Sequence, residues 1–218
     1  MDGNGRWAAA RGLPRIAGHK AGVESVRAIV RAAGELGIEA LTLYSFSTEN
    51  WLRPAEEVGE LMKLLSWALN KETLDLDKNN VRLGAIGRLE ALPKAVQSEL
   101  AKAIERLKDN TGLKLTLALN YGGRQEIADA VGKALAAGET IDEDAIGRHL
   151  YTAGLPELDL MIRTSGEMRI SNFLLWQTAY AELHVTPVLW PDFRKEHLVT
   201  AIEDFQRRDR RFGGLSTK

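Results

Sequence analysis

Apolar residues recur along this chain with two different spacings, and the two spacings alternate. Val23, Val26 and Val30 recur at intervals of three and four, which is the spacing of one helix face and predicts a helix over 20–36. The same spacing predicts helices from Pro54 to about 72 and over 93–108, 124–137, 142–150 and 194–208, with a short helical run at 7–10.

Short, mostly apolar segments lie between these helices. They predict buried strands over 39–46, 81–87, 113–120, 158–164 and 182–188. Strands that alternate with helices indicate an α/β fold, with a mostly parallel central sheet flanked by helices on both faces. The length of 218 residues suits one well-cored domain, and no repeat or linker divides the sequence, so we predict a single domain over 1–218.

Polar residues follow three of the predicted strands. Ser47, Glu49 and Asn50 follow the first, residues 120–124 follow another, and residues 163–171 follow a third. Ligands of parallel sheets bind beyond the carboxyl ends of the strands. We therefore expect these three segments to meet at one site.

Composition narrows the class of ligand. The formal net charge of −1 gives no support for nucleic-acid binding, yet arginines cluster near the start, at 163 and 169, and at 207–211, which suits a small polyanion. The absence of cysteine excludes thiolate metal sites and is compatible with a reducing cytoplasm. The printed sequence has no signal-peptide pattern and no long uncharged apolar run.

The first seven residues, MDGNGRW, combine a carboxylate with two glycines and an arginine. Glycines let backbone amides approach a phosphate, Arg6 offers a charged fork for its oxygens, and Asp2 could hold Mg²⁺ beside it. An ordinary Asp-Gly or Asn-Gly turn explains the segment equally well. The nearby Arg15, His19 and Lys20 favour an anion site.

Two later loops also have competing interpretations. Residues 45–54 can be interpreted as a loop that caps the next helix. Capping does not explain Trp51 and Arg53, so we favour a functional role for this loop. Residues 163–171 read either as a solvated loop or as a second set of anion donors, and two arginine-bearing loops at one sheet edge favour the second. Glu182 lies in an apolar stretch, where a carboxylate needs a partner or a metal.

These segments resemble the cis-prenyltransferase family, and within it the bacterial undecaprenyl diphosphate synthases. The resemblance runs almost end to end and rests on long motifs in the family's order. They are MDGNGRWA at 1–8, Arg15 with GHKAG at 18–22, FSTENWLRP at 46–54, NYGGR at 120–124, IRTSGEMRISNFLLWQ at 162–177, AYAEL at 179–183, LWPDF at 189–193 and RRFGG at 210–214.

The resemblance implies repeated condensation of isopentenyl diphosphate onto farnesyl diphosphate with cis double bonds, giving undecaprenyl diphosphate for cell-wall synthesis. It implies Mg²⁺ as cofactor, with Asp2 as metal ligand and Glu182 near the metal and a dimer contact. It implies catalytic roles for Asp2, His19 and Asn50, with Asn50 near the step of proton loss. Its implied substrate-binding residues are Gly3, Asn4, Gly5, Arg6, Trp7, Arg15, His19, Ser47, Glu49, Trp51, Arg53, Arg163, Arg169 and Ser171.

The resemblance also implies an assembly and a location. The C-terminal RRFGG is similar to a family segment that reaches a partner subunit, which implies a homodimer, and the apolar faces at 20–36 and 54–72 would wall a product tunnel. We expect a cytoplasmic enzyme with peripheral contact at the inner face of the membrane for product release. The family has an apolar strand before the Asp2 position, so we expect the natural chain to continue upstream of Met1.

Two alternatives stay open. The first is a cis-prenyltransferase with a product of different length, such as a decaprenyl or medium-length chain. The second is a non-catalytic regulatory subunit, although such relatives lack much of the diphosphate-binding apparatus that is present here at Asp2, Arg6 and Arg163.

Overall fold

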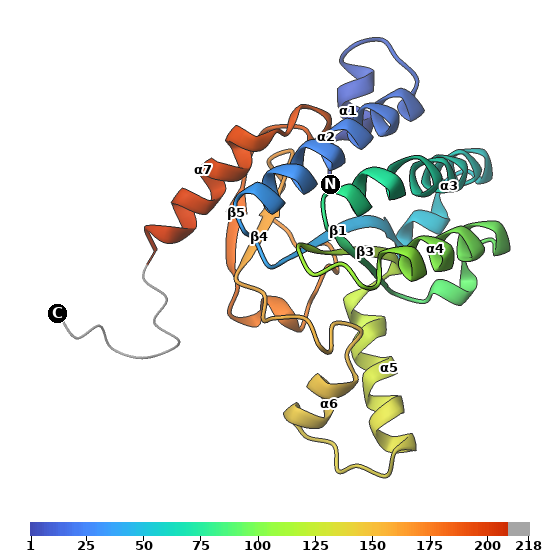
Figure 1. The fold of residues 1–218 in the computed structure, drawn as a ribbon, viewed down its shortest axis with the longest axis vertical. Coiled ribbons are helices and arrows are strands. Elements are labelled where there is room, and N and C mark those ends of the chain that lie inside the picture. The colour runs from blue at the N-terminus through green and yellow to red at the C-terminus, as the bar shows by residue number, and fades with distance from the viewer. Residues whose placement is uncertain (209–218) are drawn as a thin grey trace.

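A computed structural model gives the fold of residues 1–208 as helices packed around parallel strands (Figure 1). The helices are α1 Asn4–Ala9, α2 Arg15–Glu35, α3 Ala55–Lys78, α4 Lys94–Leu107, α5 Gly123–Ala136, α6 Glu143–His149 and α7 Lys195–Gln206. The strands are β1 Ala40–Ser47, β2 Arg82–Ile86, β3 Lys114–Tyr121, β4 Leu160–Arg163 and β5 Glu182–Val185. Each predicted helix and strand overlaps one of these elements.

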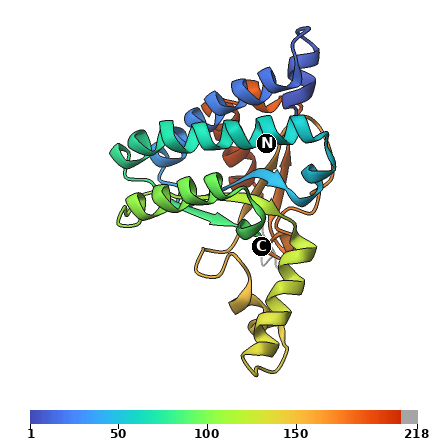
Figure 2. The same cartoon turned by 90° about the vertical axis from the view of Figure 1, so that its right-hand side faces the viewer.

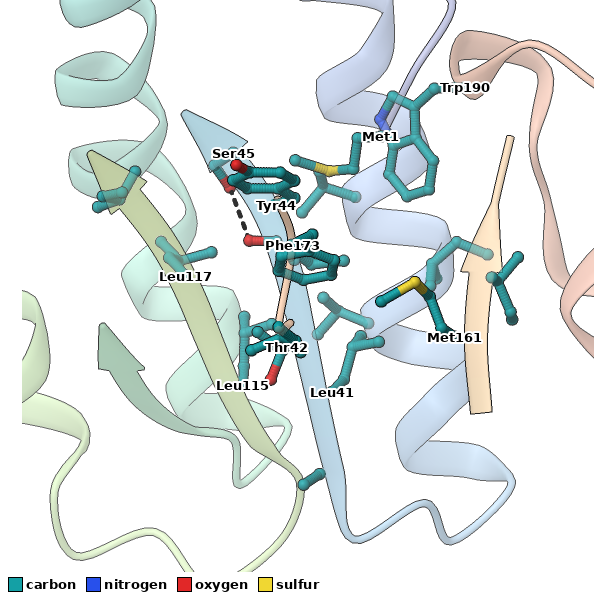
Figure 3. A pocket seen from close by; sticks show the side chains of 18 of the residues that line it. Met1, Leu41, Thr42, Tyr44, Ser45, Leu115, Leu117, Met161, Phe173 and Trp190 are labelled. Atoms are coloured by element: carbon teal, nitrogen blue, oxygen red, sulfur yellow. Dashed lines mark hydrogen bonds between the residues drawn. The ribbon is translucent and has the colours of Figure 1, made fainter. Parts of the chain in front are cut away.

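The strands pair in parallel, as predicted, but in two groups. One sheet has the order β1-β3-β2, and β4 pairs with β5 in a second sheet. Within residues 1–208 no strand bridges β1 and β4, and Figure 3 shows Leu41 and Met161 in the space between them. The parallel strands flanked by helices that we expected are present, and the described strands form them in two groups.

The main apolar core joins the first sheet to its helices. Ile29 and Val30 of α2, Met62 of α3 and Leu100 of α4 are buried in one cluster with the apolar side chains of β1 and β3. Figure 2 shows α2 and α3 side by side above β1, with α4 lying below α3. This arrangement turns the apolar faces of α2 and α3 toward the sheet.

Helix α2 begins five residues earlier than its apolar spacing predicts. Gly18 and Gly22 interrupt the apolar spacing in the sequence, but in the structure α2 packs closely against Asn4 at both. A Cβ at Gly18 would lie 1.9 Å from the Asn4 carbonyl oxygen. Pro14 precedes the first turn in an extended conformation that suits a helix start. The earlier start places Arg15 and His19 four residues apart, on one face of α2.

In the part of the chain that the structure describes, no helix combines the length and hydropathy that a membrane span requires.

Candidate active site

Asp2 lies at the centre of a charged cluster beyond the carboxyl end of β4. Its carboxylate accepts a hydrogen bond from Arg163 at 3.0 Å and from the Gly3 amide at 2.7 Å, and Arg6 lies 3.5 Å away. The backbone amide of Asp2 donates to the Thr164 hydroxyl at 2.9 Å, and that hydroxyl donates to the Asp2 carbonyl at 2.8 Å. The opening segment and the end of β4, 160 residues apart in sequence, thus form one rigid unit.

The charge state of Asp2 follows from these contacts. Burial alone would raise the pKa of Asp2, but the hydrogen bonds from Arg163 and Gly3, with the charges of Arg163 and Arg6, lower the pKa below its usual value. Asp2 is therefore an anion at neutral pH. A fixed anionic carboxylate is the ligand type that Mg²⁺ prefers.

The loop after β4 supplies the other donors of this cluster. Arg163, whose side chain is only 15% exposed, also donates to the Ser171 hydroxyl at 2.8 Å and to the Arg169 carbonyl. Arg6 donates to Ser165 and lies 3.2 Å from Glu167, which also pairs with Arg169. The predicted group of Arg6, Arg163, Arg169 and Ser171 is thus brought together in space.

His19 belongs to a second group, on the neighbouring faces of α2 and α3. Burial lowers the pKa of His19 to about 4. The positive charges of Arg53 and Arg15 act in the same direction, and the negative charge of Glu57 acts against it. Its Nε2 atom is buried without a hydrogen-bond partner, an uncommon state that leaves it available to a ligand. Arg15 and Arg53 both contact Glu57 Oε1, at 3.3 and 3.1 Å.

Both groups border one cavity of about 1860 Å³. Asp2, Arg6, Arg15 and His19 lie at its charged mouth, and the rest of the lining is mainly apolar, with charged side chains such as Arg27, Glu72 and Asp75 among it. The cavity follows β1 from Ser47 to Ala40, about 23 Å at strand spacing. Its apolar lining includes Val23, Val26, Ile29 and Val30 of α2, Leu61, Leu65 and Leu69 of α3, and Leu115 and Leu117 of β3. Figure 3 shows Leu115 and Leu117 beside β1.

The end of β1 and the loop that follows it contribute every third residue to this cavity. Ser47, Asn50 and Arg53 line it, whereas Glu49 and Trp51 do not. The Asn50 side chain accepts a hydrogen bond from the Ser47 amide at 3.1 Å, which closes a capping box around the short 3₁₀ helix Thr48–Leu52. This cap fixes Asn50 at the mouth.

Three further predicted site residues, Trp7, Arg169 and Glu182, do not line the cavity. Trp7 does not line the cavity, because its indole N–H donates to Asp192 at 2.7 Å and Arg11 covers its ring. Glu182 pairs with Leu160 at the start of β4, three strand positions and about 10 Å before Arg163. It lies 2.7 Å from Arg208 and outside the cavity, so one chain does not bring Asp2 and Glu182 to a shared metal ion. The RRFGG segment at 210–214 lies outside the described residues.

Asn120 and Thr164 lie in segments that the sequence places at the site, but it gives them no individual role, and it misses Asn172. Thr164 clamps the Asp2 backbone, Asn120 accepts the Trp51 indole N–H at 2.7 Å, and Asn172 donates to Glu49 at 3.0 Å. Asn120 and Asn172 both have positive φ, at 47° and 61°. An asparagine at the end of a predicted strand was the available signal for Asn120.

A cluster of arginines around one carboxylate, opening onto a long apolar cavity, is the arrangement expected of an enzyme that handles a prenyl diphosphate. Comparison with known proteins agrees: residues 1–213 match the family described as "Putative undecaprenyl diphosphate synthase". The chain belongs to this family and is a cis-prenyltransferase.

Individual relatives support this assignment. The chain is 54% identical to an isoprenyl transferase of Clostridium tetani, over 99% of this chain and 87% of the relative. It is 51% identical to a ditrans,polycis-undecaprenyl-diphosphate synthase of Vibrio vulnificus, described as (2E,6E)-farnesyl-diphosphate specific, over 98% and 88%. Lavandulyl diphosphate synthase of Lavandula x intermedia, crystallised with dimethylallyl diphosphate, is similar in structure with a TM-score of 0.92, 34% identity and coverage of 98% and 95%.

Proposed function

We propose that this enzyme condenses isopentenyl diphosphate repeatedly onto farnesyl diphosphate, with cis double bonds, and releases undecaprenyl diphosphate. One observation carries the proposal: a fixed, anionic Asp2 lies among Arg6 and Arg163 at the mouth of a cavity whose lining is mainly apolar. The mouth suits two diphosphates, and the cavity suits a growing hydrocarbon. The specificity stated for the Vibrio vulnificus relative supports farnesyl diphosphate as the allylic substrate.

The donors at the mouth suit two diphosphates. The assignment to substrates crosses the two spatial groups, because Arg6 contacts Asp2 together with Arg163 but is assigned with Arg15 and His19. Gly3, Asn4, Gly5, Arg6, Arg15 and His19 would bind the allylic diphosphate, and Arg163, Arg169 and Ser171 the isopentenyl diphosphate. Arg53, on the cavity side of the 47–53 loop, would add a positive charge next to His19. Donors fixed before the reaction stabilise charge on a leaving diphosphate without reorganisation.

Condensation needs the allylic carbon–oxygen bond to break, the isopentenyl double bond to attack, and a proton to leave. Arg6 and Arg15 would stabilise the departing diphosphate, while Ser47 and Asn50 line the mouth where the new bond forms. Asn50 would lie near the departing proton. The apolar walls exclude water from the developing positive charge.

Asp2 fits Mg²⁺ as cofactor. Residues 1–208 hold no group of three or more candidate metal-ligating side chains, and Mg²⁺ is commonly bound by one or two carboxylates, substrate phosphates and water. Asp2 would thus hold the ion jointly with a substrate diphosphate, and the ion would neutralise negative charge on the leaving group. Glu182 would act in this role only through another subunit.

The remaining parts of the proposal concern the product and the assembly. The cavity between α2, α3 and the first sheet would serve as product tunnel, and its length would set chain length. Exposed Tyr180 and Leu183 flank Glu182 and suit a homodimer contact there. The enzyme would work in the cytoplasm, with peripheral membrane contact as the long product leaves.

Incubation with farnesyl diphosphate, radiolabelled isopentenyl diphosphate and Mg²⁺, followed by chromatographic sizing, tests the function. We expect a product of 55 carbons, which is eight condensations, since each adds five carbons to the fifteen of farnesyl. A decaprenyl or medium-length product would correct the chain length only. No incorporation by the wild-type chain would contradict the proposed activity and favour a regulatory subunit.

A further inference from the structure

The NYGGR segment at 120–124 has no role in the function proposed above, although it ends at the same sheet edge. Asn120 is 5% exposed and lies in the buried end of β3, close to the 47–53 loop that lines the mouth. Its positive φ of 47° coincides with a register shift between β1 and β3, and the strand continues to the buried Tyr121. A buried polar side chain in such a conformation needs fixed partners.

Both ends of the Asn120 amide are engaged. Its Oδ1 accepts the indole N–H of Trp51 at 2.7 Å, and its Nδ2 donates to the Arg88 carbonyl at 2.8 Å. The Arg88 amide in turn donates to the Asn120 carbonyl at 3.2 Å. Asn120 therefore attaches Trp51 to a rigid connection between the ends of β2 and β3.

Trp51 is well suited to transmit this attachment. Its ring packs edge-on against the buried Phe46, with centroids 5.0 Å apart. Its single polar atom is used by Asn120, and the side chain does not line the cavity. The indole is therefore an anchor for the loop, with no polar group left for substrate.

Glu49, on the other side of Asn50, is anchored in the same way. Its carboxylate accepts from Asn172 Nδ2 at 3.0 Å, and Asn172 Oδ1 accepts the Arg124 amide at 2.9 Å. The Asn172 carbonyl accepts the Gly123 amide at 2.7 Å. Bulkier residues do not fit here, because a Cβ at Gly122 would lie 2.8 Å from Asn172 Nδ2.

We propose that Asn120 and Asn172 are positioning residues that hold Asn50 at the reacting centre through its two neighbours in sequence, Trp51 and Glu49. This inference rests on the proposed function, because it takes Asn50 to act near the departing proton. Asn50 lines the cavity, whereas the residues on either side of it are fixed outside the cavity. Loosening either neighbour displaces Asn50 without removing any group assigned to the allylic diphosphate.

A double-mutant cycle tests this proposal. Trp51→Phe keeps a ring but removes the indole N–H, and Asn120→Gly removes the amide while tolerating the positive φ. We expect each to lower kcat about tenfold with the KM for farnesyl diphosphate within twofold, since the residues assigned to that substrate lie on α1 and α2. Because both changes break the Trp51–Asn120 contact, the double variant should lose far less than the roughly hundredfold of independent effects. Any loss beyond that of Trp51→Phe reflects the second hydrogen bond of Asn120, to the Arg88 carbonyl.

Asn110→Gly is the matched control. Asn110 donates to the Val81 carbonyl at 2.9 Å and to Asp77 at 3.3 Å, outside the cavity. We expect its kcat to stay within twofold of the wild type. Additive losses in the cycle, wild-type kcat in Asn120→Gly, or an equal loss in Asn110→Gly would overturn the proposal.

An NMR measurement separates this inference from the proposed activity. Trp51→Phe identifies the Trp51 indole resonance, which Asn120→Gly should shift. The Ser47 amide, which donates to Asn50, should exchange with solvent at least tenfold faster in Asn120→Gly and unchanged in Asn110→Gly. Unchanged Ser47 exchange would refute positioning of Asn50 whether or not the enzyme turns over.

Discussion

Two carboxylates at the mouth each contact two arginines, yet their settings differ. Asp2 contacts Arg163 and Arg6, and its backbone is clamped by Thr164. Glu57 contacts Arg15 and Arg53 from the first turn of α3, and Arg15 is 60% exposed. The first carboxylate is built into the fold, whereas the second makes side-chain contacts that a diphosphate can replace. The same pattern of one carboxylate between two arginines therefore gives a fixed anion at Asp2 and, at Glu57, ion pairs that a substrate diphosphate can replace.

Removing Asp2 is the strongest way to test this difference. We expect Asp2→Ala to lower kcat at least a thousandfold, because metal assistance contributes several kcal/mol to such steps, while affinity for farnesyl diphosphate changes only a few-fold. Glu57→Gln, whose amide still bonds one arginine, should keep kcat within tenfold. Steady-state kinetics at saturating Mg²⁺ measures both, and similar losses in the two variants would remove the distinction.

Arg15 offers the next largest effect. Arg15→Gln should raise the KM for farnesyl diphosphate about tenfold with little change in kcat, since a charged hydrogen bond contributes about 1.5–3 kcal/mol and exposure reduces this. Arg11→Gln is the matched control, because Arg11 covers Trp7 and contacts Asp192 outside the cavity. A KM that moves equally in both variants would place the allylic diphosphate elsewhere.

His19 should make the stability of the folded chain depend on pH. Its pKa is about 4 in the folded chain and about 6.5 when unfolded, so the unfolded state binds the proton first as the pH falls. Its contribution to stability is complete above pH 6.5 and is lost between pH 6.5 and 4, by at most about 3 kcal/mol. Urea unfolding of wild type and His19→Gln across this range measures it, and parallel curves would contradict the assignment.

The smallest effect is expected at Trp7. Trp7→Phe loses the hydrogen bond to Asp192, so we expect about 1 kcal/mol of destabilisation and unchanged kcat and KM. Thermal unfolding and steady-state kinetics give the two readouts. A raised KM would restore the substrate-binding role that the family resemblance implied for this residue.

The sequence predicts the order of helices and strands better than it predicts the contacts between them. Apolar spacing identifies every strand, because burial leaves a local pattern. It does not reveal that α2 starts at Arg15, since Gly18 reads as an interruption until Asn4 is placed against it. Which strands pair, β1 with β3 and β4 with β5, depends on partners distant in sequence, and so does the separation of Glu182 from Asp2.

The site shows the same limit on a smaller scale. The motif places Glu49, Asn50 and Trp51 at the site together, with Asn50 catalytic and its two neighbours binding substrate. Only the contacts of Asn172 and Asn120 separate the two anchors from the residue between them. Charged residues such as Arg163 and Arg169 are easier to recognise, because few local structures explain arginines at a strand end.

Helix α2 connects substrate entry with the space for product. Its 21 residues extend about 32 Å, with Arg15 and His19 in the first two turns and Gly34 lining the far part of the cavity. A Cβ at Gly34 would meet no atom within 4 Å. Gly34 is therefore a suitable position for engineering product length. We expect Gly34→Leu to shorten the product, because the added side chain lies about four helical turns from the charged residues that start each cycle.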